Sequence, residues 1–264
     1  MMKGKKGRST RRVAKLLQER RRINLSKSSV HVAAKRAGLS PYKRQQKPLL
    51  TEDQQARRLA FANKFHRENF RLWLFTDENT FELFGHPKND FIWHTSASEV
   101  PPSAKVKHPP KLHVWAGFSY YGKTDLVVFE GNMTADFYVD EILNHRLPAD
   151  GPRIFGNRRW TFQQDGDPKH TSHKAQDWLR DHVPRFIKKD DWPANSPDQN
   201  PMENLWGIIQ DRVYAKEPRT AAALERIIRE QWNAVSAETL QSLADSMPRR
   251  LAAVIAAQGG STKY

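Results

Sequence analysis

The stretch WTFQQDGDPKHTS, residues 160–172, decides how the large part of this chain is built. Its first residues include Trp, Thr and Phe, which favour a strand, and Asp165 follows them. A Gly-Asp-Pro segment then ends the strand, and a helical pattern begins. In open α/β sheets, sites form beyond the carboxyl ends of the strands. The stretch therefore predicts an acidic site at a strand end, with the basic residues Lys169 and His170 beside it.

Strand patterns also precede this stretch. Residues 71–85, RLWLFTDENTFELFG, predict a strand, a short turn and a second strand, and residues 111–131 predict a strand pair around a Tyr121–Gly122 turn. The other expected elements alternate: a helix over 135–147, a strand over 158–165, a helix over 171–182, a short strand over 184–189, and helices after Pro201. Hairpins followed by such units predict an α/β fold, a mixed sheet flanked by helices, with the strand order of a ribonuclease-H-like domain.

The basic charge of the chain is concentrated at its N-terminal end. The 264 residues carry a formal net charge of +15, from 44 Lys or Arg and 29 Asp or Glu. Residues 1–50 contain 16 of the basic residues and one acid, Glu19, so the remainder holds 28 of each sign and is neutral. A basic patch of this kind is typical of a module that binds a polyanion such as duplex DNA. A disordered basic tail is the alternative reading.

Helical periodicity in this basic segment favours a folded module over a tail. One helix is expected from Thr10, and a second follows with Ser26 as its N-cap and Gly38 as its C-terminal stop. The second helix has one apolar face, formed by Val30, Ala33, Ala34 and Ala37. Two short helices joined by a tight turn predict a small all-α helix-turn-helix domain.

In a helix-turn-helix domain the second helix enters the major groove of DNA. Its outward side chains near the N-terminus, Lys27, Ser28 and His31, are predicted to reach base edges. Lys35 and Arg36 lie further along the same helix and are better placed for phosphates. These five residues are the predicted DNA contacts of the module.

Composition also bears on cellular location. The chain has no cysteine, which excludes a disulfide scaffold and any cysteine-based zinc site. No apolar run approaches the roughly 18 residues that a membrane span requires, so no membrane association is expected. The basic run from Lys5–Lys6 to Arg20–Arg22 fits a nuclear localisation signal, although DNA contacts alone would account for it. The expected location is the nucleus.

A third helix is expected where the composition changes. The residues Thr51–Gln54, TEDQ, have the spacing of a capping box and precede the helical pattern QARRLAFANKF. The sequence therefore predicts three parts: a basic helix-turn-helix domain over 1–48, a linker helix over 49–70, and a ribonuclease-H-like catalytic domain over 71–264.

Three carboxylates occupy positions where such a sheet forms its site. Asp77 is expected at the end of the first strand, Asp165 at the end of the later one, and Glu203 in the first turn of the helix that starts at Pro201. Carboxylates that lie close together repel each other unless a cation joins them. Mg²⁺ suits such a site because it takes carboxylate and water oxygens. Two such ions about 3.5–4 Å apart can activate a water or a 3′-hydroxyl and stabilise the leaving oxygen of a phosphodiester.

Each of these acids has an alternative reading. Asp77 and Asp165 also suit ordinary turns at strand ends, as Asp167 does before a proline. Glu203 has the position from which a glutamate reaches back to the helix cap, with Asn200 as that cap. Lys169 and His170 also fit a solvated basic turn. His170 with His173, or His108 with His113, could suggest a zinc site, but no cysteine accompanies them and hard oxygen ligands lie nearby, which disfavours zinc.

Ordered blocks around the three acids resemble a known family. The blocks LFTDENTFEL, FQQDGDPKHTS and DWPANSPDQNPMENLW look like the three catalytic blocks of the Tc/mariner superfamily of DDE transposases. Residues 114–131 resemble the strand pair that lies between the first two. The stretch NLSKSSVHVAAKRAGLSPYK, residues 24–43, is similar to the second of the family's two helix-turn-helix units. The resemblance extends from about Ser9 to Val213.

The resemblance implies a function as well as a fold. It implies that Asp77, Asp165 and Glu203 bind two divalent ions, Mg²⁺ or Mn²⁺. It also implies that the protein is an enzyme of cut-and-paste transposition. Water would cleave the DNA at the terminal inverted repeats of the transposon, and the freed 3′-hydroxyls would attack target DNA at TA. A homodimer is the expected assembly. Lys169 and His170 are expected near the scissile or flanking phosphate.

The chain departs from the family pattern in two places. Between Asp165 and Glu203 lie 37 residues, slightly more than in the best-known members, which indicates a variant subgroup. The family's first helix-turn-helix and its Gly-Arg-Pro-Arg-type linker are expected before the second helix-turn-helix unit. In this sequence only residues 1–12, MMKGKKGRSTRR, stand there. A truncated or repurposed DNA-binding protein without transposition activity is therefore the competing hypothesis. Retention of all three acids favours the enzyme.

Overall fold

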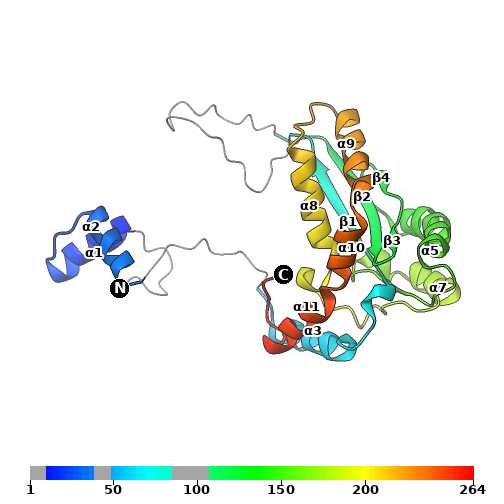
Figure 1. The fold of residues 1–264 in the computed structure, drawn as a ribbon, viewed down its shortest axis with the longest axis horizontal. Helices are drawn as coiled ribbons and strands as arrows, with labels where there is room; N and C mark the ends of the chain where they lie inside the picture. The colour runs from blue at the N-terminus through cyan, green and yellow to red at the C-terminus, as the bar shows by residue number, and fades with distance from the viewer. Residues whose placement is uncertain (1–9, 39–48, 85–106) are drawn as a thin grey trace. The chain divides into compact units, whose positions relative to one another are not determined.

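The computed structural model describes residues 10–38, 49–84 and 107–264 of the chain (Figure 1). The chain divides into two compact units, Met1–Lys47 and Pro48–Tyr264. The predicted domain boundary at residue 48 and the basic pair Lys5–Lys6 lie outside the described residues. No helix in the described ranges is both long and apolar enough to cross a lipid bilayer.

The first unit contains two helices, α1 (Thr10–Arg21) and α2 (Lys27–Arg36). The hydroxyl of Ser26 accepts a hydrogen bond from the backbone N–H of Ser29 at 3.0 Å, so Ser26 is the N-cap that the sequence predicts. Gly38 follows α2 with a φ of 70°, a conformation that favours glycine after a helix. Both predicted helices are therefore confirmed.

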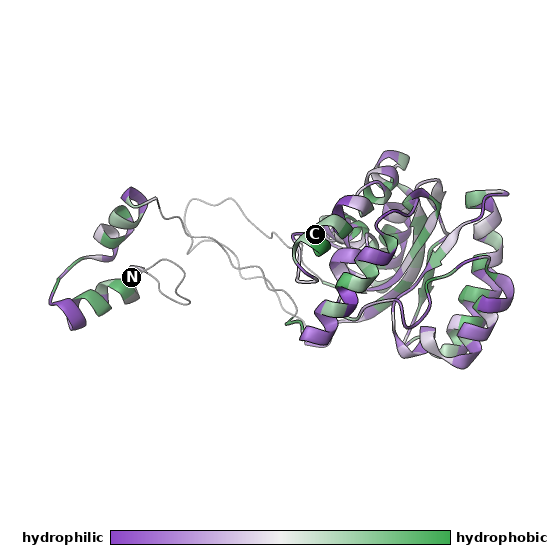
Figure 2. Cartoon of the chain, turned by 90° about the horizontal axis from the view of Figure 1, so that it is seen from below, coloured by the Kyte–Doolittle hydropathy of each residue, from purple (hydrophilic) through white to green (hydrophobic). Residues whose placement is uncertain are grey.

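The apolar face predicted on α2 is mostly exposed. Of its four residues only Val30 is buried, and in α1 the buried apolar residue is Val13. Large apolar side chains elsewhere in this unit are also exposed: Ile23, Leu25 and Val32. Apolar and polar residues alternate along both helices (Figure 2). Two short helices bury little surface against each other, and this explains why periodicity alone overestimated the core here.

The second unit is built on a mixed five-stranded sheet. Its strands are β1 (Trp73–Glu82), β2 (Lys111–Ser119), β3 (Gly122–Lys123), β4 (Val127–Phe129) and β5 (Thr161–Gln163). The order is β3-β2-β1-β5, and β4 also pairs with β2. The β1 strand is antiparallel to β2 and parallel to β5. The α/β class with a mixed sheet is therefore confirmed.

One long strand replaces the two that the sequence predicts over residues 71–85. The β1 strand runs without a turn from Trp73 to Glu82, through the polar residues Asp77 to Thr80. Each of these pairs with a residue of β2, from Ala116 to His113. The continuous ladder with β2 keeps this polar segment extended, so the predicted turn was wrong.

The predicted strand pair over residues 111–131 forms with a division in its second strand. The β2 strand ends at Ser119 and β3 begins at Gly122, so the chain reverses close to the predicted turn. After β3 the chain leaves the ladder and returns to β2 as β4. The expected strand over 158–165 is only three residues long, and 184–189 contributes a single bridge from Phe186 to Phe162.

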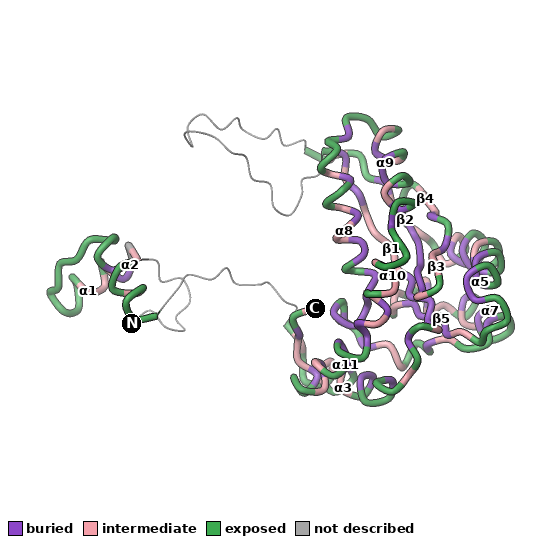
Figure 3. Tube along the Cα trace, viewed as in Figure 1, coloured by how far each residue is buried: buried purple, intermediate pink, exposed green. Residues whose placement is uncertain are grey.

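Helices cover both faces of the sheet, and each face has its own core (Figure 3). One layer contains α3 (Glu52–Phe65), α8 (Met202–Tyr214), α9 (Ala221–Asn233), α10 (Ala237–Ala244) and α11 (Met247–Ala256). The other contains α4 (Ala135–Phe137), the π-helical η3 (Tyr138–Arg146), α5 (Leu147–Phe155) and α7 (His173–His182). Consecutive β1 residues alternate between the layers: Trp73 and Phe75 face the first, and Leu74 faces the second.

The helix predicted over 135–147 is longer in the structure. The segments α4, η3 and α5 follow one another without a break from Ala135 to Phe155. The sequence PADGP suggests a stop, yet Pro148 lies at the start of α5, where the π-helical η3 ends, and Pro152 lies inside α5. Burial of Ile154 and Phe155 in the second core favours the extension.

The helix α3 belongs to the second unit. Its capping box is confirmed: Thr51 accepts from the N–H of Gln54, and Gln54 accepts from the N–H of Thr51. The helix packs on α11. Its residue Arg58 donates to the carbonyl of Gly259 and is only 1% exposed. This segment, expected as a linker helix, is therefore part of the wall of the large unit.

Candidate active site

The register of the sheet brings Asp77 and Asp165 to equivalent positions on neighbouring strands. Phe75 of β1 pairs in parallel with Gln163, the last residue of β5. Two residues further along each chain are Asp77 and Asp165. The sequence predicted Asp77 at the end of the first strand, but it lies in the middle of β1, because β1 continues beyond its pairing with β5. The strand end at which the two aspartates meet is that of β5.

Glu203 reaches the same place from the first turn of α8. The N-cap of α8 is Pro201, not Asn200 as predicted, but the side chain of Asn200 accepts the N–H of Met202 at 3.1 Å beside it. All three acids line one open cleft of about 440 Å³, together with Asp167 and other residues. The structure thus brings the three predicted acids together around one space.

Charge and burial act strongly on Asp77. Its pKa is raised well above the usual value, first because burial disfavours the charged form and then because Glu203, Glu78 and Asp165 add negative charge nearby. Such crowding of carboxylates is relieved when a cation binds between them. The donor set therefore fits a hard divalent ion. Among the described residues, however, no three histidine or carboxylate side chains are already gathered closely enough to hold an ion.

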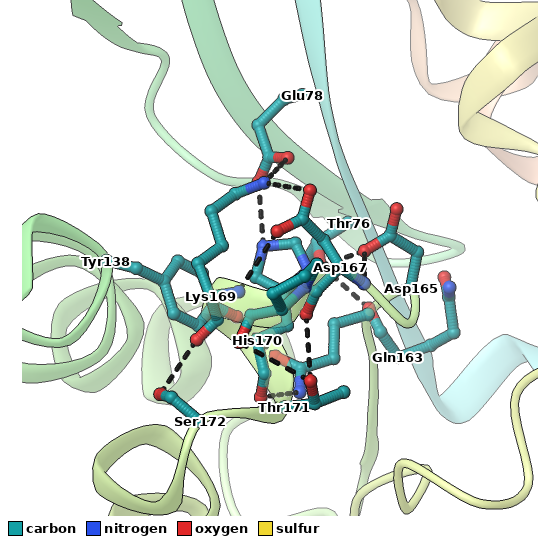
Figure 4. A network of polar contacts seen from close by, with 12 residues as sticks. Thr76, Glu78, Tyr138, Gln163, Asp165, Asp167, Lys169, His170, Thr171 and Ser172 are labelled. Carbon is teal, nitrogen blue, oxygen red and sulfur yellow. Dashed lines mark hydrogen bonds and ion pairs between the residues drawn. The ribbon is translucent and has the colours of Figure 1, made fainter. Parts of the chain in front are cut away.

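Asp165 interacts with a histidine from the same loop (Figure 4). The imidazole of His170 donates from Nδ1 to Oδ1 of Asp165 at 2.6 Å, and Nε2 lies 3.0 Å from Oε1 of Glu78. Burial alone would lower the pKa of His170, but hydrogen bonds to the two carboxylates and their charges outweigh it and raise the pKa from 6.5 to about 9. In turn, burial would raise the pKa of Asp165, but His170 and the N–H of Asp167 lower it.

His170 does not have the surroundings of a DNA contact. The residue is 2% exposed, and carboxylates take both of its ring nitrogens. A contact from this ring to a phosphate would require one of these bonds to break, and it stays a prediction. The alternative reading, a solvated basic turn, does not describe this ring. The ring is instead covered by Tyr138, whose ring centroid is 4.4 Å away.

Lys169 and Asp167 fill the outer side of the same loop. The ammonium of Lys169 lies 3.1 Å from Oε2 of Glu78 and 2.9 Å from Oδ2 of Asp167, with 14% of its side chain exposed. Asp167 accepts the N–H of Lys169 and caps the short helix α6 (Pro168–Thr171). The turn role foreseen for Asp167 is therefore present. A phosphate contact from Lys169 stays a prediction.

The predicted DNA contacts of α2 are all exposed. These are Lys27, Ser28, His31, Lys35 and Arg36. Ser28 and Arg36 also line a shallow hollow on the helix surface, beside Val32 and Ala33. Exposure is necessary for contact with DNA and does not demonstrate it.

Two residues that shape the site were not predicted from the sequence. Glu78 follows Asp77 directly and binds both His170 and Lys169. Asp198 lies in the DWPANSPDQNP segment and forms a buried bidentate pair with Arg58, at 2.7 Å for each oxygen. Glu78 has a sequence signal, since it adjoins a predicted ligand. The partner of Asp198 is 140 residues away, which no local pattern reveals.

Comparisons with known proteins show the family of the chain. A family described as DDE superfamily endonuclease matches residues 72–225, more than half of the chain. The Tc1 transposase of Caenorhabditis elegans is 31% identical over 246 residues, which cover 90% of this chain and 88% of that protein. The chain belongs to the Tc/mariner family of DDE transposases. The family match spans all three acids of this transposase.

Solved structures show the fold of this transposase. The Mos1 transposase paired-end complex with the left transposon end has a TM-score of 0.79 at 18% identity, over 97% of this chain and 75% of that one. The Mos1 mariner paired-end complex with Mn has a TM-score of 0.78 at 17% identity, over 97% of this chain and 76% of that one. The large unit therefore has the ribonuclease-H-like fold that the sequence predicts.

Proposed function

We propose that the chain is an active cut-and-paste transposase with Asp77, Asp165 and Glu203 as its catalytic acids. The observation that supports this most is their common cleft, in a chain whose family match covers all three. The three acids come from β1, from the loop after β5 and from α8, so only the assembled fold brings them together. Burial, and then the negative charge of the neighbouring carboxylates, raises the pKa of Asp77, and a cation bound between the acids would relieve this crowding.

Two Mg²⁺ or Mn²⁺ ions held by these acids would supply Lewis acid chemistry that activates the attacking oxygen and stabilises the leaving one. The Mos1 complex with Mn supports the use of divalent metal. The protein's own contribution is to hold the three carboxylates around one space. Asp77 is held by the β1–β2 ladder and Glu203 by the first turn of α8. Lys169, at the rim, is available to bind a DNA phosphate if it leaves its carboxylate partners.

We further propose that the substrate is double-stranded DNA. The Mos1 structure with a transposon end supports terminal inverted repeats as the binding sites. The basic first unit supplies the positive charge for this binding, through Lys27, Ser28, His31, Lys35 and Arg36 on a helix-turn-helix. Strand transfer into TA target DNA, a homodimer and a nuclear location complete the proposal.

A cleavage assay tests this function. The full chain is incubated with Mg²⁺ or Mn²⁺ and duplex DNA that carries the terminal repeats flanking its own gene. We expect cleavage at the repeat ends and strand transfer into TA sites. Asp165→Asn should abolish both and leave DNA binding nearly unchanged. Asp167→Asn, which keeps the cap of α6 and removes the ion pair with Lys169, should retain most cleavage. Equal loss in both variants would contradict the assignment of Asp165. Specific binding without any cleavage would support a DNA-binding protein instead.

A further inference from the structure

The buried imidazole of His170 joins the loop of Asp165 to strand β1. Its Nδ1 lies 2.6 Å from Oδ1 of Asp165 and its Nε2 lies 3.0 Å from Oε1 of Glu78, the residue after Asp77. One ring therefore spans the two segments that hold the catalytic aspartates. The side chain of His170 is 3% exposed, and that of Asp165 is 41% exposed. The ring thus contacts Asp165 from the protein interior, on the side away from solvent.

Several elements hold this ring in place (Figure 4). The backbone carbonyl of His170 accepts hydrogen bonds from Nε2 of Gln164 at 3.1 Å and from Nε2 of Gln176 at 2.8 Å. The hydroxyl of Tyr138 in η3 donates to Oε1 of Gln164 at 2.5 Å, and the Tyr138 ring packs on the imidazole. Residues of η3, α7 and the β5 end therefore fix both the backbone and the plane of His170.

The two oxygens of Asp165 have different surroundings. Oδ1 accepts from His170 and from the backbone N–H of Asp167 at 3.0 Å. Within the described part of the chain, no hydrogen bond to Oδ2 is present, so Oδ2 is the oxygen available for a ligand in the cleft. A carboxylate with one oxygen held by two donors cannot rotate freely about its last bond. The contacts of Oδ1 therefore determine where Oδ2 points.

Glu78 anchors the other end of the ring. Its Oε1 faces His170, and its Oε2 lies 3.1 Å from Nζ of Lys169. Glu78 lies on β1, whose ladder with β2 fixes its backbone opposite Trp115. The imidazole of His170 is thus anchored to β1, the strand that carries Asp77.

We propose that His170 is a positioning residue of the catalytic site: anchored on Glu78, it holds Oδ1 of Asp165 so that Oδ2 presents to the divalent metal. The proposal rests on the proposed function, because it assumes that Asp165 is a metal ligand. Outer partners that orient a metal ligand commonly contribute strongly to metal affinity. Neither His170 nor Glu78 touches the reacting DNA in this role.

Two amide substitutions separate the two bonds of the ring. In His170→Asn the short amide places its NH₂ close to the position of Nδ1, which retains the bond to Asp165. In His170→Gln the longer amide places its NH₂ close to the position of Nε2, which retains only the bond to Glu78. Mn²⁺ binding to each full-length variant is measured by isothermal titration calorimetry in the absence of DNA. We expect His170→Gln to bind Mn²⁺ about 10–100-fold more weakly than wild type, and His170→Asn to stay much closer to it.

Glu78→Asp provides a second test in case His170→Gln does not fold. It keeps the charge but shortens the side chain, which removes the contact to His170, so we expect Mn²⁺ binding to weaken by about threefold or more. Glu82→Asp on the same strand is the matched control, because Glu82 pairs with the exposed Lys111 at 2.8 Å and lies away from the cleft. Its Mn²⁺ affinity should equal that of wild type.

The outcomes distinguish this inference from the proposed function. If wild type binds Mn²⁺ and the folded His170 and Glu78 variants bind it equally well, the positioning role is wrong and the proposed function stands. The same conclusion follows if His170→Asn and His170→Gln lose affinity equally and in step with a lower Tm, since that indicates a purely structural role. If wild type itself binds no Mn²⁺, the proposed function fails and the inference fails with it.

Discussion

Glu203 is an exposed residue of the first turn of α8, and its position suits either a helix cap or a metal ligand. A substitution of this single residue can distinguish the two roles, because one affects stability and the other affects cleavage. The N–H of Met202 donates to the side chain of Asn200, and the N–H of Asn200 donates to the carbonyl of Pro197 at 3.2 Å. A glutamate is therefore not needed to accept the N–H of Asn200, and Glu203 lines the cleft.

We predict that Glu203→Gln keeps the fold and loses cleavage. Gln retains the size and the hydrogen-bonding groups of the side chain but is a poorer ligand for a hard ion. The free energy of unfolding should change by less than about 0.5 kcal/mol, as for most surface substitutions. Loss of a residue that only orients a metal ligand costs about 10–100-fold in activity. Because Glu203 is proposed as a ligand itself, the cleavage rate should fall by more than this. Asp211→Asn, on the same helix, is the control. A Glu203→Gln protein that unfolds yet cleaves normally per folded molecule would favour the cap.

At the scale of the element, the close approach of β2 to β1 beside Asp77 depends on Gly117. This residue pairs with Thr76. A Cβ at Gly117 would lie 2.7 Å from Cγ2 of Thr76 and 3.0 Å from the carbonyl oxygen of Phe75, closer than ordinary van der Waals contact. Part of this contact is with backbone, which a side-chain rotation cannot relieve.

Gly117→Ala should therefore displace β1 next to the first catalytic acid. We expect it to destabilise the fold by about 1–3 kcal/mol, the usual cost of overpacking, and to reduce cleavage per folded molecule. Urea denaturation and single-turnover cleavage measure the two effects. Gly122→Ala is the matched control, because its Cβ would meet only Ile154 at 3.7 Å. Wild-type stability in Gly117→Ala would show that the strands separate more easily than this spacing indicates.

At the scale of the whole molecule, one buried ion pair connects three distant segments of the large unit. Arg58 of α3 binds both oxygens of Asp198 and also donates from Nε to the carbonyl of Gly259 at 2.8 Å. Asp198 further accepts from the N–H and the hydroxyl of Thr262. The segment before α8 is thus joined to α3 and to the end of the chain.

This pair predicts a loss of stability in acid. Burial would raise the pKa of Asp198, but hydrogen bonds and charge from Arg58, with hydrogen bonds from Thr262, lower it. The folded-state pKa is therefore below the unfolded value of about 3.9, so the stabilisation is complete above that pH and is lost as the pH falls through the folded-state pKa. Asp198→Asn should cost about 3–5 kcal/mol at pH 7 and remove this acid step. Asp245→Asn, in the exposed pair with Arg71, should cost at most about 1 kcal/mol. Equal costs for the two variants would contradict the structural role of the buried pair.

The division of charge gives a second prediction at this scale. Because residues 1–50 hold the entire net charge of +15, duplex binding by the full chain should weaken with salt by about 0.9 in log affinity per log salt for each phosphate neutralised. Deleting residues 1–47 should remove most of this dependence and leave a folded second unit. Fluorescence anisotropy at several salt concentrations measures it. Undiminished, equally salt-sensitive binding by the 48–264 fragment would show that DNA binding resides in the large unit.

The sequence by itself determined the features that depend on near neighbours. Ser26 and Thr51 cap their helices through residues three positions away, so the spacing was sufficient to predict both. The three acids were predicted from the sequence blocks that contain them, and the fold places all three along one cleft. The mixed sheet followed from the order of these elements along the chain.

Only the tertiary structure decided the features that depend on distant partners. The polar centre of β1 is extended because β2 pairs with it, and local propensity suggested a turn. His170 lies in a segment of polar character, yet Tyr138 and Glu78 bury and bind it. Arg58 meets Asp198 across 140 residues of sequence. Burial and pairing of this kind are set by chain segments that come together only on folding, and a local pattern contains no information about them.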